Sequence, residues 1–169
     1  AVSNAVIGPQ NTATLTIRSD AEDTDLAPQV VRLGQAYTQD FSAGQPHRPD
    51  GWEYYSTSDG RIQVVEGRLR MDDTVRGGYS LNEAILHVDL AGQAGVQLSV
   101  DHWRLGDERH PLPATFTGHA NGDGIAVSAD GVTWHAVQGL NLRRDLRWVM
   151  DLDAVIADLG ISYTDDFQI

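Results

Sequence analysis

The segment from residue 104 to residue 123, RLGDERHPLPATFTGHANGD, concentrates side chains that could bind a metal ion. It shows no strand pattern and is long for a connection between strands, and long loops are usually functional or mobile. Calcium takes about six to eight oxygen ligands from carboxylates, amides, carbonyls and water. The spacing predicts a calcium site formed by Asp107, Glu108, Asn121 and Asp123. The alternative is that residues 121–124, NGDG, are only a turn before a strand.

Two other groupings suggest metal chemistry. His110 and His119 share this loop, and with Asp107 or Asp123 they could bind a transition metal such as zinc. The second grouping is an acidic cluster around a glycine-rich turn, made of Asp72, Asp73 and Glu83. Calcium is one interpretation of that cluster, and capping of a turn by paired aspartates is the other.

Aromatic side chains suggest a surface for ligand binding. Trp52 and Tyr54 lie on one face of a predicted strand, and Trp103 lies where another strand enters the long loop. Exposed flat rings beside polar groups bind sugars by stacking and hydrogen bonding. We therefore expect a ligand site built from these rings and neighbouring histidines: Trp103, His102, Trp52, Tyr54 and His119. Packing in the core is the alternative, and it is the one we prefer for Trp134 and Trp148.

No catalytic motif is present in the sequence. It contains neither the Glu-x-Asp-x-x-Glu strand of sandwich glucanases nor a Gly-x-Ser-x-Gly elbow, phosphate loop or dinucleotide fingerprint. We expect no enzymatic activity. A hydrolase would instead require two carboxylates facing each other in a cleft, for example Glu83 and Asp101.

The composition excludes several partners. The net charge is −12, from 24 acidic and 12 basic residues, and none of the basic residues is lysine. Such a surface is unsuited to nucleic acid or to anionic membranes and favours divalent cations. Without cysteine, disulfides and thiolate metal sites are impossible. No apolar run is long enough to span a bilayer.

Many short runs of strand pattern follow residue 35, separated by Gly and Asp turns. The predicted strands are Ala36–Phe41, Trp52–Ser56, Arg61–Val65, Arg68–Met71, Glu83–Leu90, Val96–Trp103, Gly124–Ser128, Thr133–Val137, Arg147–Leu152 and Ser162–Ile169. A short helix is predicted at Asp153–Leu159, with an Asp cap and a Gly stop. This pattern predicts an all-β, antiparallel β-sandwich of jelly-roll type with one short helix near the C-terminus.

The N-terminal part differs in pattern from the region after residue 35. Residues 11–18, NTATLTIR, alternate as a strand, and an acidic, turn-rich stretch follows. NTATLTIRSD resembles the last strand of a Calx-beta domain, an extracellular calcium-binding sandwich. The resemblance implies that residues 1–20 are the C-terminal strand of a preceding domain, with an acidic linker at 21–34.

The stretch from Gly51 to Ile169 resembles a jelly-roll module of large exported bacterial proteins, related in layout to concanavalin-like and MAM-type sandwiches, and we expect the jelly-roll domain to span 35–169. The segments that carry the resemblance are GWEYYS, GRIQVVEGRLRMDD, YSLNEAILHVDL, GDERHPLPATFTGHANGDGIAVSADGVTW and ISYTDDFQI. In related chains the last segment continues into another strand. We therefore expect the fold to lack its final strand or strands and to leave an unpaired edge at Phe167–Ile169.

These observations favour a secreted or cell-surface bacterial module, non-catalytic and calcium-stabilised, that binds extracellular polysaccharide or another glycan and contacts neighbouring domains of its parent chain. One alternative is a structural spacer or assembly module without a small ligand. The second alternative is a glycoside hydrolase-like sandwich.

Overall fold

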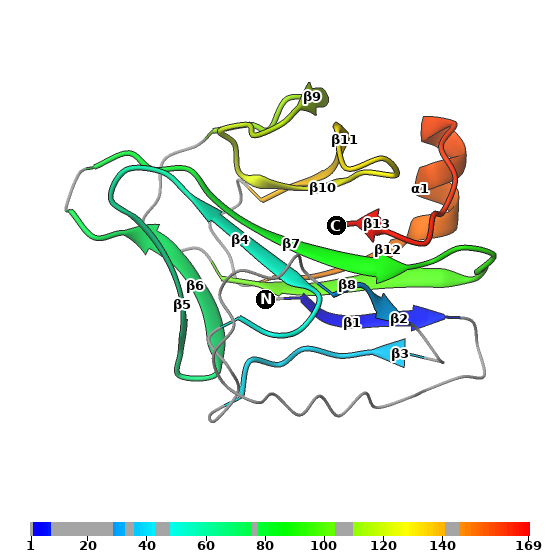
Figure 1. Ribbon diagram of the computed structural model, residues 1–169, viewed down its shortest axis with the longest axis horizontal. Coiled ribbons are helices and arrows are strands. Elements are labelled where there is room, and N and C mark those ends of the chain that lie inside the picture. The colour runs from blue at the N-terminus through cyan, green and yellow to red at the C-terminus, as the bar shows by residue number, and fades with distance from the viewer. Residues whose placement is uncertain are drawn as a thin grey trace.

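The computed structural model describes residues 2–7, 29–32, 36–42, 48–75, 78–103, 110–140 and 146–169, with the backbone alone at 2–7 and 146. The described part is strand-rich and contains one short helix (Figure 1). The elements are β1 (Val2–Ile7), β2 (Val31–Arg32), β3 (Ala36–Tyr37), β4 (Trp52–Ser56), β5 (Gly60–Val65), β6 (Arg68–Asp73), β7 (Asn82–Asp89), β8 (Val96–His102), β9 (Thr115–Thr117), β10 (Gly124–Val127), β11 (Thr133–Gly139), β12 (Leu146–Asp151), α1 (Leu152–Leu159) and β13 (Phe167–Gln168).

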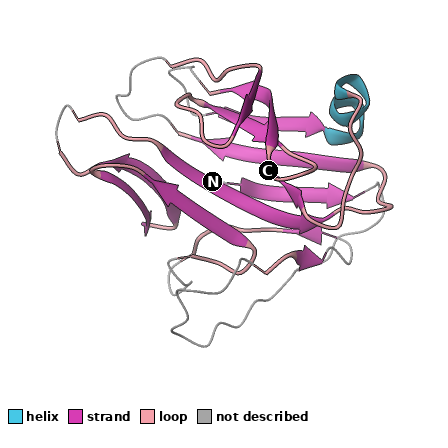
Figure 2. Ribbon diagram, turned by 45° about the horizontal axis from the view of Figure 1, so that its top comes forward, coloured by secondary structure: helices cyan, strands magenta, loops and turns pink. Residues whose placement is uncertain are grey.

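The strands form a sandwich (Figure 2). One sheet has the order β12-β8-β1-β3. In the facing sheet the central strand is β7, which pairs with β13 on one edge and with β4 and β2 on the other. A smaller sheet has the order β10-β11-β9, and β5 and β6 form a hairpin. The predicted all-β sandwich with one short C-terminal helix is confirmed.

Alternation along β7 and β8 decides which residues face the core. Leu86 and Val88 of β7 are buried, as are Leu98 and Val100 of β8, and all four belong to one hydrophobic cluster. Removing such side chains from water stabilises the fold by about 25 cal/mol per Å² of apolar surface. The intervening residues of both strands face away from this core, and they form the two outer faces on which candidate sites must lie.

The helix α1 ends at Gly160 as predicted but begins one residue earlier, and its N-cap is Asp151 instead of Asp153. The Asp151 carboxylate accepts a hydrogen bond from the Ala154 N–H at 3.2 Å, and Gly160 ends the helix with φ 66°. Asp153 fixes the helix to the start of β8, because its carboxylate accepts the N–H groups of Gly95 (2.5 Å) and Val96 (3.1 Å). The predicted short helix is therefore confirmed.

Three strands were not predicted. The first, β1, pairs with β8 and β3 although it lies in the range assigned to a preceding domain. The second, β2, lies inside the predicted linker, and Val31 belongs to the core. The third, β9, lies in the segment predicted to lack strands. Residues 8–28, which contain NTATLTIR and most of the linker, lie outside the described residues, so the predicted domain boundary at residue 20 stays a prediction.

The segment Phe167–Ile169 is paired on both sides. Gln168 exchanges two backbone hydrogen bonds with Ser128, both 2.9 Å, and Ile169 exchanges two with Leu86, at 2.8 and 3.0 Å. This short strand therefore joins the β7 sheet to the end of β10. The prediction of an unpaired edge here is wrong, because both rows of backbone groups are occupied.

Candidate functional site

An aromatic patch lies at the end of β8. Trp103 is 50% exposed, and the Arg68 guanidinium at the start of β6 lies over its ring, with Cζ 4.1 Å from the ring centroid. A cation over an indole face is attracted by the negative face of the ring. The β5–β6 hairpin thus positions a charged group against the exposed tryptophan. Trp103 and Arg68 are far apart in sequence, and no sequence pattern connects them.

A charged pair shares the outer face of β8 and β12 with this ring. Arg147 donates to both carboxylate oxygens of Asp101, at 2.7 Å each, and the two residues are Cα partners in the β12–β8 register. The Asp101 carboxylate raises the pKa of the Arg147 guanidinium. Asp101 and Trp103 are two residues apart, so they project from the same side of the strand. We refer to Trp103, Arg68, Asp101 and Arg147 as the aromatic patch.

His102 does not belong to this patch. It lies opposite Leu146 in the β12–β8 register and is partly buried. By alternation it faces the other side of β8 from Asp101 and Trp103.

Trp52 is part of the core. It is 2% exposed, its indole Nε1 donates to the Tyr37 hydroxyl at 2.6 Å, and its ring packs edge-on against Phe41. Tyr54 points to the same side of β4 and packs against the core, and burial raises the pKa of its hydroxyl. The prediction that Trp52 and Tyr54 form a surface platform is therefore wrong, because the buried face of β4 is the one that carries them.

His119 lies on the outer face of the other sheet. Its ring stacks on Tyr55 with centroids 3.5 Å apart and planes 4° apart, and its Nδ1 is 2.5 Å from Glu83 Oε2. The Ala120 N–H donates to the second oxygen of Glu83 at 3.3 Å. Tyr55 was not among the predicted site residues. Alternation along β4 places its side chain on the face opposite to that of Trp52, and this signal could have identified it. These contacts attach the connection between β9 and β10 to β4 and β7.

The described part of the predicted calcium loop is held by two hydrogen bonds between His110 and Asp123. The Asp123 carboxylate accepts the His110 N–H at 3.0 Å, and the Asp123 N–H donates to the His110 carbonyl at 2.5 Å. Asn121 is exposed, and Asp107 and Glu108 lie outside the described residues. Within the described ranges, no three His, Asp or Glu side chains are grouped closely enough to hold a metal ion. The predicted calcium site thus stays a prediction that depends on residues 104–109.

The other two metal hypotheses are not supported by the described contacts. The His119 ring contacts Glu83, whereas the printed bonds between His110 and Asp123 are made by the His110 backbone, so the described contacts do not bring the two histidine rings to a common carboxylate. In the acidic cluster, Arg61 and Arg70 pair with Asp72 and lower the pKa of its carboxyl. Asp73 accepts the Val75 N–H at 2.7 Å. These aspartates cap a turn and pair with arginines instead of surrounding an ion.

Glu83 and Asp101 do not face one another. They lie on the outer faces of two different sheets, with the core between them, and each has its own cationic or polar partner. The geometry suggested for a hydrolase is therefore not formed by this pair. No described helix is both long and apolar enough to span a membrane.

One buried histidine was missed. His87 lies on the outer side of β7, yet its side chain is only 8% exposed, because Glu53 and Asp166 lie against its two ring nitrogens. Alternation could have placed His87 and Glu53 on one face, but Asp166 comes from a distant segment. Comparison with known proteins adds no family to this description: no protein-family model, curated protein or solved structure matches the chain.

Proposed function

We propose that this chain is a non-catalytic, extracellular binding module of a bacterial surface or exported protein, and that it binds glycan through the aromatic patch. The observation that carries the proposal is the half-exposed Trp103 ring with Arg68 over it and the Asp101–Arg147 pair on the same side of β8. Membrane lipid and nucleic acid are poor candidates as partners because the net charge is −12.

Each part of the patch has a function in sugar recognition. An indole ring offers a flat apolar surface to the C–H faces of a pyranose. The guanidinium groups donate hydrogen bonds and carboxylates accept them, which suits hydroxyl groups that do both. Arg68 and Arg147 are each already placed by a contact, to the Trp103 ring and to Asp101, so little side-chain freedom is lost on binding.

The experiment is a titration of a glycan panel followed by tryptophan fluorescence and calorimetry. Trp103→Ala should abolish binding, whereas Tyr79→Ala removes an aromatic ring that is 73% exposed elsewhere and should leave binding unchanged. Equal affinity in both variants would exclude the patch as the binding site. If no glycan binds, the proposal is wrong, and the alternative function, a structural spacer, is favoured.

We also propose that calcium stabilises the module through the loop at residues 104–123, and this proposal has its own test. Binding of an ion to the native state alone raises the unfolding midpoint with increasing free ion concentration. Thermal unfolding in EDTA and in millimolar Ca²⁺ should therefore differ, and the difference should disappear in Asp107→Ala. An identical midpoint in both conditions would mean that the loop binds no calcium.

The structural spacer is favoured by a specific observation of its own. Trp52 and Trp134 are buried, so two of the four tryptophans serve packing. A spacer would bind no glycan, and its function would be to hold neighbouring domains of the parent chain apart. The glycan titration distinguishes the two proposals directly.

A further inference from the structure

A basic surface adjoins the aromatic patch. It is the outer face of the β5–β6 hairpin, since Val64 and Leu69 on the inner face pack against the core. Alternation places six side chains on the outer face: Arg61, Gln63, Val65, Arg68, Arg70 and Asp72. Three of them are arginines and one is acidic, so this face has the opposite sign to the whole chain, whose net charge is −12. We refer to these six residues as the hairpin face.

Asp72 does not neutralise the hairpin face. Arg61 donates to both oxygens of its carboxylate, at 2.8 and 2.7 Å, and Arg70 Nη2 lies 2.5 Å from one of the same oxygens. One carboxylate therefore serves two guanidinium groups, each of which has five N–H donors. The side chains of Arg61 and Arg70 remain 37% and 47% exposed. Donors are thus left over for an anion that approaches from solvent.

Arg68 joins the hairpin face to the aromatic patch. Its guanidinium lies over the Trp103 ring, and no carboxylate of the described ranges forms an ion pair with it. Arg70 is two positions further along β6 and therefore lies about 7 Å away on the same face. A sugar stacked on Trp103 has Arg68 beside it, and the next sugar of the same oligosaccharide can reach Arg70.

The chemistry of these donors favours an acidic ligand. A guanidinium binds an oxyanion through two parallel N–H···O bonds, and such bonds are stronger than those to a neutral hydroxyl. A neutral sugar would leave the surplus positive charge of the hairpin face unpaired. Building on the proposed function, we propose that the bound glycan is an acidic oligosaccharide, whose carboxylate or sulfate groups bind Arg68 and Arg70 while one of its rings stacks on Trp103.

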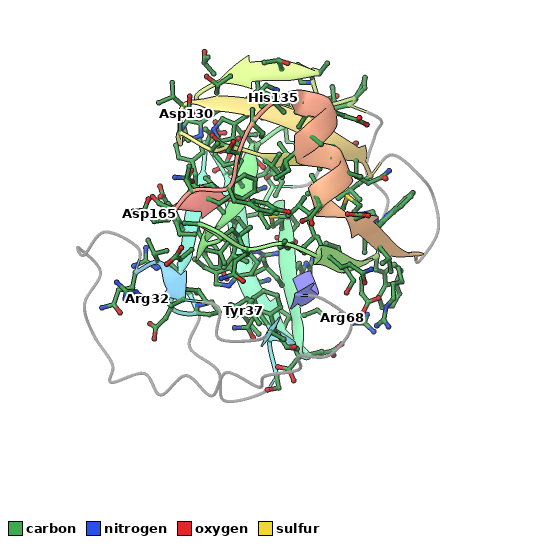
Figure 3. The ribbon with its side chains drawn as sticks, turned by 90° about the vertical axis from the view of Figure 1, so that its right-hand side faces the viewer. Arg32, Tyr37, Arg68, Asp130, His135 and Asp165 are labelled. Carbon is green, nitrogen blue, oxygen red and sulfur yellow. The ribbon has the colours of Figure 1, made fainter. Side chains whose placement is uncertain are left out.

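The rest of the surface restricts the ligand to a short acidic chain. Figure 3 shows Arg68 on the other side of the domain from Asp130 and Asp165, which are exposed. Near the site, Asp101 is paired with an arginine, and Glu66 is exposed in the turn between β5 and β6. Charges more than about 8 Å away are largely screened at physiological salt. A short oligosaccharide therefore meets the arginines, whereas a long polyanion such as nucleic acid extends onto the acidic remainder.

The experiment is a calorimetric titration of the full chain with two matched pairs of oligosaccharides. Oligogalacturonate and its methyl ester differ in carboxylate charge, and a sulfated galactan oligosaccharide and its desulfated form differ in sulfate. The parent chain should bind the acidic member of one pair at least about tenfold more tightly than the neutral member, and added NaCl should reduce this preference. The pair that shows the preference identifies the acidic group as carboxylate or sulfate.

Arg70→Gln is the decisive variant, because it removes a charge from the hairpin face and leaves the Arg68 contact with Trp103 in place. It should weaken binding of the acidic member about fivefold, which is the effect that an exposed ion pair can reach, and leave binding of the neutral member unchanged. The control Arg32→Gln changes the net charge equally from an exposed position on β2 and should bind both members like the parent chain.

The outcomes separate this inference from the proposed function. If acidic and neutral members bind equally tightly and Trp103→Ala abolishes both, the inference is wrong and the proposed function stands. The inference is also wrong if Arg70→Gln binds the acidic member as tightly as Arg32→Gln does. If no oligosaccharide of either pair binds, and none of the wider glycan panel binds, the proposed function is wrong and the inference falls with it.

Discussion

The buried hydrogen bond between Trp52 and Tyr37 allows a quantitative prediction about stability. The indole Nε1 donates to the Tyr37 hydroxyl at 2.6 Å, and the two side chains are 2% and 1% exposed. Tyr37→Phe keeps the ring and removes only the hydroxyl, so the Trp52 N–H remains buried without its acceptor. Gln39 also loses a partner, because its side chain bonds the same hydroxyl.

A buried donor left without an acceptor costs about 1–3 kcal/mol. For a chain of this length, 1 kcal/mol corresponds to about 2–4 °C in the unfolding midpoint. We therefore expect Tyr37→Phe to lower the midpoint by about 4–8 °C and the free energy of unfolding by about 2 kcal/mol.

Thermal and urea unfolding followed by circular dichroism measure this change. The matched control is Tyr79→Phe, which removes a hydroxyl from a side chain that is 73% exposed and should change the free energy by less than about 0.5 kcal/mol. If Tyr37→Phe were as stable as the control, the Trp52 N–H would have another acceptor and the reasoning would be refuted.

Three further predictions concern pH and capping. Burial raises the pKa of Tyr37 from 10.0 to about 12, so the parent chain should lose stability between pH 10 and 12 in alkaline unfolding; Tyr37→Phe should lose less, and the remaining loss comes from tyrosines such as Tyr54 whose pKa burial also raises. The N–H groups of Thr133 and Val132 lower the pKa of Asp130 to about 2; its contribution to stability should be lost as the pH falls from about 4 to 2, and Asp130→Asn should flatten that part of an acid unfolding curve. Asp151→Ala removes the N-cap of α1 and should cost about 1 kcal/mol in urea unfolding; an unchanged midpoint would mean that the cap contributes nothing.

Local patterns in the sequence were sufficient for most of the described strands and for the helix. The strand Trp52–Ser56 was predicted with its observed bounds, because period-two patterns and Gly/Asp turns are encoded within a few residues. The helix was predicted from an Asp cap and a Gly stop; the Gly stop was correct, but the observed cap is Asp151 instead of Asp153. The two-residue strand β2 is too short for a pattern, and it exists because β7 offers it a partner.

The sites were harder to predict because they depend on contacts between distant segments. Alternation on β4 separates Trp52 from Tyr55, but it does not say which side faces the core. Trp52, predicted to lie on the surface, is in the core, and Tyr55, for which no role was predicted, stacks on His119 at the surface. Likewise, Arg68 reaches Trp103 and Asp166 reaches His87 only through the packing of the sheets, and a single sequence carries no signal of either contact.

The pairing of Phe167–Ile169 has a consequence for how the domain assembles. These residues bond to Leu86 on one side and to Ser128 on the other, and both partners are synthesised much earlier. Contacts between residues far apart in the chain slow folding, because loops must close before the contacts contribute. During synthesis, the backbone groups of Leu86 in β7 and of Ser128 after β10 have no partner until Phe167–Ile169 has been made. In that interval the unpaired edges are exposed, and unpaired strand edges are prone to pairing with another chain.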